Sequence, residues 1–131
     1  MAEGGREAMI ARFRALPEAI RGTYPQMAEA MLDEIRSNIR AQVSPGGVPW
    51  PASPTGKPVL LMAQDALRYS VTGSTIVLSI NGDCVRHHFG GVRGGRMRQI
   101  LPRSVASLER ARKRIDYLAR RAVKEALRGA K

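Results

Sequence analysis

The chain has 131 residues, with 44% hydrophobic and 25% charged side chains, values typical of a globular protein with a single domain. Its one cysteine excludes an internal disulfide framework and a zinc site built from cysteines alone. No apolar run approaches the roughly 20 residues of a bilayer span, and no basic start followed by an apolar stretch marks a signal peptide, so we expect a protein made in the reducing cytoplasm with no membrane partner.

The charge is strongly positive and unevenly distributed. Lys and Arg number 22 against 11 Asp and Glu, which gives a net charge of +11. Residues 71–131 hold 14 basic and 4 acidic side chains, so almost all of the net positive charge belongs to the C-terminal half. Such a field attracts polyanions, whether nucleic acid, anionic lipid or an acidic protein face. Arginine dominates, which favours bidentate contacts with phosphate or carboxylate.

Two helices are predicted at the start of the chain. Residues 6–16 place four apolar side chains on one face, and Pro17 should either start a new turn or kink the helix. Residues 23–43 form a better helix, with Pro25 in its first turn and an apolar stripe at Met27, Met31, Leu32, Ile35 and Ile39. The opposite side carries Glu29, Glu34, Arg36 and Arg40. We interpret Met9, Met27, Met31 and Met62 as core residues.

A loop rich in proline and glycine follows over residues 44–58. Five prolines and three glycines in 15 residues forbid both a helix and a central strand, so we expect a flexible loop. The single tryptophan, Trp50, lies in its middle. Two interpretations stay open: Trp50 anchors the loop on the core, or it is held out for a partner.

Short strands are predicted next. Residues 67–71 alternate, Gly73-Ser74 makes a turn, and residues 74–80 are rich in β-branched side chains. Asn81-Gly82 is a strong hairpin signal, and residues 84–89 form the return strand. We therefore expect a small three-stranded antiparallel meander.

The C-terminal third combines a basic loop with a basic helix. Residues 90–99 interleave glycines with Arg93, Arg96 and Arg98, and we expect a second flexible loop. From Ser104 or Ser107 to Leu127 the pattern predicts a long amphipathic helix. Its apolar stripe is Leu108, Ala111, Ile115, Leu118, Ala119, Ala122, Val123 and Ala126, and its other faces carry Arg110, Arg112, Lys113, Arg114, Arg120, Arg121, Lys124 and Arg128. The predicted fold class is α+β.

No constellation of residues indicates catalysis, a metal site or a cofactor. Neither a phosphate-binding loop motif nor a zinc-protease motif is present. His87 and His88 would point to opposite faces of a strand, and Cys84 is best interpreted as a small apolar residue. The residues thus predict a protein that is not an enzyme. One function class they favour is a small, non-specific nucleic-acid-binding protein.

Five short segments, in their order and spacing, resemble the phage virion morphogenesis or tail completion family. They are P-G-G-V-P-W-P (45–51), T-G-K-P-V-L-L (55–61), A-L-R-Y-S-V (66–71), V-R-H-H-F-G-G (85–91) and I-L-P-R (100–103), with the Asn-Gly hairpin between the third and fourth. The likeness spans about residues 36–125. Ser104 and Val105 stand where the family has a second proline and an aromatic residue.

The resemblance implies a structural protein of the head–tail junction of a tailed phage or related particle. Such a protein would be assembled in the host cytoplasm and reside in the virion, in a ring of identical copies that joins the tail tube or terminator to the head connector. Motif positions expected to contact partners are Trp50, Pro51, His88, Phe89, Gly90, Pro102 and Arg103. A basic lumen would contact genomic DNA without reading its sequence, or its basic side chains would face an acidic partner. The positions expected to face DNA or an acidic partner are Arg93, Arg96, Arg98, Arg112, Lys113, Arg120 and Arg121.

Overall fold

The computed structural model describes residues 2–82 and 98–128, with side chains described from residue 5 onward. The fold is α+β, as predicted. In chain order its elements are α1 (Ala2–Arg21), α2 (Tyr24–Ala41), the short helix α3 (Ala63–Ala66), strands β1 (Leu67–Thr72) and β2 (Thr75–Ile80), a 3-10 turn η1 (Val105–Ser107) and α5 (Glu109–Arg128).

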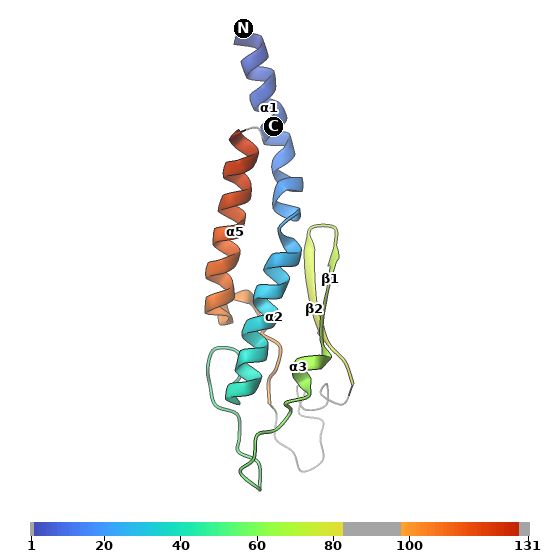
Figure 1. Ribbon diagram of the computed structural model, residues 1–131, viewed down its shortest axis with the longest axis vertical. Coiled ribbons are helices and arrows are strands. Elements are labelled where there is room, and N and C mark those ends of the chain that lie inside the picture. Colours follow the sequence, from blue (N-terminus) through green and yellow to red (C-terminus); the bar gives the residue numbers. More distant parts are fainter. Residues whose placement is uncertain (1, 83–97, 129–131) are drawn as a thin grey trace.

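Helix α2 occupies the centre of the molecule. Helices α1 and α2 follow each other along the long axis, and α5 runs back beside both in the opposite direction (Figure 1). The hairpin of β1 and β2 lies on the other side of α2 (Figure 1). The apolar stripe predicted for α2 is confirmed, because its members are all buried. All of them except Met27 pack in one cluster with Trp50, Leu60, Leu67, Ile100 and Leu108.

Helix α1 is longer than its sequence indicates. It continues through Pro17 to Arg21, so the helix does not end at the proline, and a kink there stays a prediction. The helix is interrupted instead at Gly22 and Thr23, where the Thr23 hydroxyl and amide both donate to the carbonyl oxygen of Ile20 at 2.6 and 2.9 Å. Packing of α1 along α5 compensates for the hydrogen bond that the proline removes.

The first turns of α1 extend beyond the last described turn of α5 (Figure 1). Met9, Ile10 and Phe13 are consequently exposed, although the helical pattern places them on an apolar face. The interpretation of the methionines as core residues is correct for Met27 and Met31 and wrong for Met9 and Met62, which are 43% and 65% exposed. Helical periodicity shows which side of a helix is apolar but not how far its neighbour reaches.

The first two strands of the predicted meander are present. Strands β1 and β2 pair antiparallel from Leu67 opposite Ile80 to Thr72 opposite Thr75, around the predicted turn at Gly73 and Ser74. Gly73 has φ +59°, a conformation that favours glycine. The cross-strand pairs Leu67–Ile80, Tyr69–Leu78 and Val71–Ile76 share one face. The expected third strand, residues 84–89, lies outside the described residues.

The C-terminal helix begins two to five residues later than predicted, after the 3-10 turn. Its start is capped from α2: Oε1 of Glu34 accepts the backbone N–H of Ala111 at 2.7 Å. Glu34 was placed by helical periodicity on the polar side of α2 with Glu29, but it is buried. A carboxylate at a helix N-terminus satisfies an amide that lacks an intrahelical partner and interacts favourably with the helix dipole.

Candidate functional site

The motif segment 45–51 is hydrogen-bonded to residues that lie 47 or more positions further along the chain, directly before the motif segment 100–103. The indole N–H of Trp50 donates to the carbonyl oxygen of Gln99 at 3.0 Å. In return, Nε and Nη2 of Arg98 donate to the carbonyl oxygen of Pro51 at 3.1 and 3.0 Å. Ile100 follows directly and is fully buried. We call Trp50, Pro51, Arg98, Gln99 and Ile100 the motif clasp, because they join the loop after α2 to the segment before α5.

The motif clasp tests what the sequence predicted for Trp50 and for Arg98. Trp50 is only 8% exposed, so the first interpretation, an anchor on the core, holds and the indole is not presented to a partner. Arg98 was expected to face DNA or an acidic partner, and this is wrong, because it is 7% exposed and its guanidinium is bound to a backbone carbonyl. Its sequence neighbourhood of glycines and arginines carries no sign that one arginine folds inward.

Gln42 is a structural residue that the sequence does not reveal. It follows α2 with φ 61° and ψ 41°, a left-handed conformation uncommon outside glycine. Its side-chain amide donates to the carbonyl oxygen of Val59 at 2.8 Å and accepts the amide of Val59 at 2.7 Å, while its own carbonyl accepts the amide of Trp50 at 2.8 Å. Gln42 therefore closes the loop of residues 44–58 at its base.

This loop has no helix or strand, as its prolines predict, apart from one isolated bridge between Val43 and Pro49. It is attached at Gln42 and at the motif clasp. The expected flexibility of residues 44–58 stays a prediction, and most of the second loop, residues 90–97, lies outside the described part of the chain.

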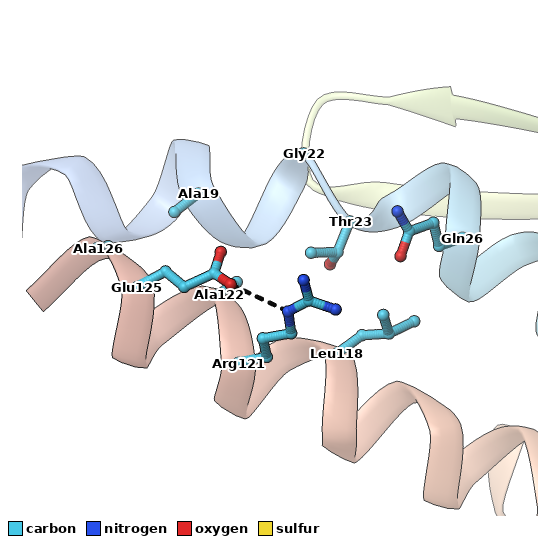
Figure 2. Close-up of a pocket in the computed structure, with 9 residues that line it drawn as sticks. All are labelled: Ala19, Gly22, Thr23, Gln26, Leu118, Arg121, Ala122, Glu125 and Ala126. Atoms are coloured by element: carbon cyan, nitrogen blue, oxygen red, sulfur yellow. Dashed lines mark hydrogen bonds and ion pairs between the residues drawn. The ribbon is translucent and has the colours of Figure 1, made fainter. Parts of the chain in front are cut away.

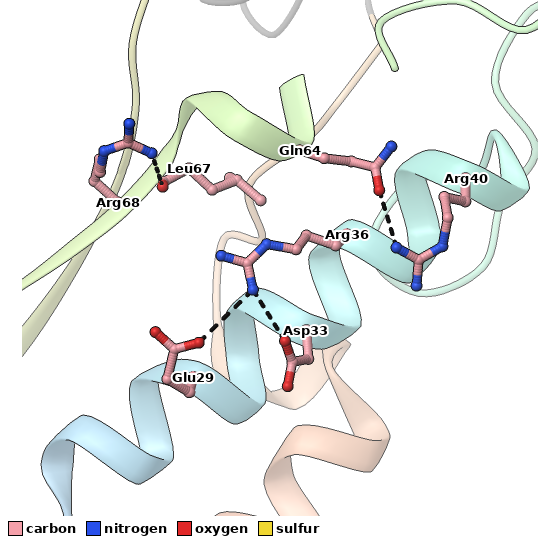
Figure 3. Close-up of polar contacts among 7 residues, drawn as sticks. All are labelled: Glu29, Asp33, Arg36, Arg40, Gln64, Leu67 and Arg68. Carbon is pink, nitrogen blue, oxygen red and sulfur yellow. Dashed lines mark hydrogen bonds and ion pairs between the residues drawn. The ribbon is translucent and has the colours of Figure 1, made fainter. Parts of the chain in front are cut away.

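Arginines on α2 and β1 are held within the subunit. Nη1 of Arg36 lies 2.9 Å from the carboxylate of Asp33 and 3.7 Å from that of Glu29 (Figure 3). Arg40 donates to the side chain of Gln64 on α3 at 2.9 Å, and Arg68 donates to two backbone carbonyl oxygens (Figure 3). Arg40 connects α2 to α3, whereas Arg36 pairs within α2 and Arg68 binds the backbone directly before it. Arg40 and Arg68 remain exposed.

Helix α5 is different, because all eight of its basic side chains are exposed. This group includes Arg112, Lys113, Arg120 and Arg121, the four helix positions expected to face DNA or an acidic partner. The three carboxylates of α5 form exposed ion pairs one turn away: Glu109–Lys113 at 3.6 Å, Asp116–Arg120 at 3.5 Å and Glu125–Arg121 at 3.0 Å. The other five cations have no carboxylate within 4.0 Å among the residues that the structure describes.

Arg121 lies at a hollow where α5 meets the junction of α1 and α2. Small side chains let the helices approach there, and Arg121 turns toward Glu125 (Figure 2). The hydrogen bond to the Glu125 carboxylate, together with its negative charge, raises the pKa of Arg121. The side chains that line this hollow include no pair of a nucleophile and a general base. They belong to Ala19, Gly22, Thr23, Gln26, Leu118, Arg121, Ala122, Glu125 and Ala126.

Tyr117 is a surface residue to which the charge pattern assigned no function. It is 47% exposed and lies with Lys113, Arg120 and Lys124 along a shallow groove. The guanidinium carbon of Arg114 lies 5.1 Å from the centre of its ring, a cation–π contact. Helical spacing in the sequence could have shown this position. Tyr117 lies one helical turn after Lys113 and one turn before Arg120 and Arg121, on the polar side of the helix.

The remaining expected site residues divide into two groups. Pro102 is half-buried and Arg103 is exposed, so a partner contact there stays a prediction. The second group lies outside the described residues and consists of His88, Phe89, Gly90, Arg93 and Arg96.

Within residues 2–82 and 98–128, no group of three or more His, Cys, Asp or Glu could hold a metal ion. Over the same ranges, no helix is both long enough and apolar enough to cross a bilayer.

No family model, curated protein or solved structure matches this chain.

Proposed function

We propose that this protein is a structural subunit of the head–tail junction of a tailed phage or related particle. As a tail completion or neck protein, it would work as a ring of identical copies in the virion, between the tail tube or terminator and the head connector. Its contribution would be to assembly and not to catalysis.

The observation that carries this proposal is the motif clasp. The segments 45–51 and 100–103, which carry much of the resemblance to the tail completion family, are far apart in the chain. Three hydrogen bonds join Trp50 and Pro51 of the first segment to Arg98 and Gln99, which directly precede the second segment. Ile100, the first residue of the second segment, is buried in the same apolar cluster as Trp50. Motifs that converge on one structural unit support a shared fold better than motifs scattered over a surface, because their spacing then has a physical cause.

The distribution of charge also supports assembly by head-to-tail contacts. A ring interface places one face of a subunit against a different face of the next copy. The N-terminal half is nearly neutral and binds Arg36 and Arg40 to side chains of the same subunit, whereas α5 presents its eight cations outward. The two sides of the subunit are therefore chemically distinct, as a head-to-tail ring requires.

Deletion of the gene from the genome that carries it tests the proposal. We expect DNA-filled heads and separate tails by electron microscopy, with intact particles restored when the wild-type gene is supplied from a plasmid. The protein should also be found by mass spectrometry in purified particles. Intact, infectious particles without the gene would overturn the proposal, as would a gene neighbourhood without portal, capsid or tail frames.

A further inference from the structure

One side of α5 carries a row of exposed side chains opposite its buried residues Ala111, Leu118 and Ala122. The row recurs every three or four residues, which keeps it on one face of the helix. We call it the α5 ridge, and its members are Arg110, Lys113, Tyr117, Arg120, Lys124 and Arg128. At a rise of 1.5 Å per residue the ridge is about 27 Å long.

The charge of the ridge is only weakly compensated. Lys113 and Arg120 each have one exposed carboxylate partner, at 3.6 and 3.5 Å. Exposed pairs of this kind are weak, so the cations exchange readily to another anion. The other three cations of the ridge have no carboxylate within 4.0 Å in the part of the chain that the structure describes. The ridge thus presents five cations in a line.

We propose that the α5 ridge binds the phosphate backbone of double-stranded DNA without reading its bases. A line of cations matches a line of phosphates, and each contact releases counterions from the DNA. Arginine side chains grip phosphate oxygens with two N–H groups, and the Tyr117 hydroxyl adds a donor in the middle of the row. Because α5 packs along α1 and α2, the backbone positions that carry the cations are fixed before binding, which reduces the entropy lost on association.

Two other polyanionic surfaces fit the ridge less well. An amphipathic helix that binds a membrane inserts its apolar face, but the apolar face of α5 is buried against α1 and α2. A protein interface has an apolar centre surrounded by polar groups, whereas the ridge has charges from end to end around a single aromatic ring. Binding to the DNA backbone requires neither an apolar helix face nor an apolar centre in the interface.

This inference goes beyond the head–tail assignment and does not need it. DNA binding by the ridge is a property of the purified protein, whereas the junction proposal is tested by particle assembly. A ridge variant that no longer binds DNA would leave the junction proposal in place, and intact particles after gene deletion would leave the ridge in place.

The test compares two triple variants of equal net charge. The ridge variant is Lys113→Gln, Arg120→Gln and Lys124→Gln, and the control variant is Arg6→Gln, Arg14→Gln and Lys57→Gln, three cations that are exposed outside the ridge. Binding to a fluorescent 30-base-pair duplex is measured by anisotropy between 50 and 200 mM salt. If all three ridge cations contact phosphates, their removal should reduce the slope of log affinity against log salt by about 3.

We expect the ridge variant to bind at least about 30-fold more weakly than the wild-type protein at 50 mM salt, and the control to stay within about threefold. Circular dichroism melting checks that both variants fold. The charge-retaining variant Lys113→Arg/Lys124→Arg should bind like the wild type, and its loss of binding would overturn the proposal. Equal losses in ridge and control variants would also overturn it, as would tighter binding to phosphatidylserine vesicles than to duplex DNA.

Discussion

Helices α2 and α5 are similar in length and lie side by side, but they differ in what they bury and what they expose. Seven residues of α2 are buried, against three of α5. Arg36 and Arg40 of α2 are bound to neighbouring side chains within the subunit, whereas five of the eight cations of α5 have no carboxylate within 4.0 Å in the described part of the chain. Stability and surface charge are therefore carried largely by separate helices: α2 organises the core, and α5 presents a charged surface supported by it.

The largest effect is expected at Trp50, which joins the core around α2 to the segment before α5. Trp50→Ala removes a buried indole and its hydrogen bond to Gln99, and should lower the free energy of unfolding by about 3–5 kcal/mol. Urea unfolding followed by circular dichroism measures this, because the variant contains no tryptophan for fluorescence.

A matched variant separates the contribution of the aromatic ring to stability from that of its hydrogen bond. Trp50→Phe keeps an aromatic ring but leaves the Gln99 carbonyl without the indole donor, so we expect a smaller loss, of about 1–3 kcal/mol. If Trp50→Ala unfolded at the same urea concentration as the wild type while particle assembly failed, the indole would serve a partner and not the core.

An intermediate effect is expected at Glu34, the direct polar link from α2 to α5. Glu34→Ala leaves the Ala111 amide buried without its acceptor and should destabilise the protein by about 1–3 kcal/mol, measured as the shift in urea midpoint. Glu29→Ala on the exposed side of α2 is the control, with a loss of about 0–1 kcal/mol. Equal effects at both positions would show that the cap on α5 contributes nothing.

The smallest effect on stability is expected on the outer side of α5. The triple ridge variant should change the free energy of unfolding by no more than about 0.5 kcal/mol, because its side chains are exposed and their ion pairs are long. Thermal melting of this variant beside Arg36→Ala sharpens the contrast between the helices. A large destabilisation by the ridge substitutions would mean that α5 also depends on its outer charges to fold.

The local pattern of the sequence predicted the elements well. Helical spacing found α2 and α5 to within about five residues at each end, and alternation with a Gly-Ser turn found β1 and β2. These elements depend on interactions over a few residues, so the information lies within short windows. The extent of α1 was missed because a proline in a helix can be compensated by packing that no short window contains.

Periodicity and charge are properties of single elements, so the α+β composition, the core stripe of α2 and the basic outer side of α5 could be predicted before the fold was known. The fold was needed to show that Glu34, Trp50 and Arg98 turn inward and that Met9 and Phe13 remain exposed. In each case the outcome depends on a partner far away in the chain: the start of α5 for Glu34, the opposite half of the motif clasp for Trp50 and Arg98, and the reach of α5 for the two residues of α1.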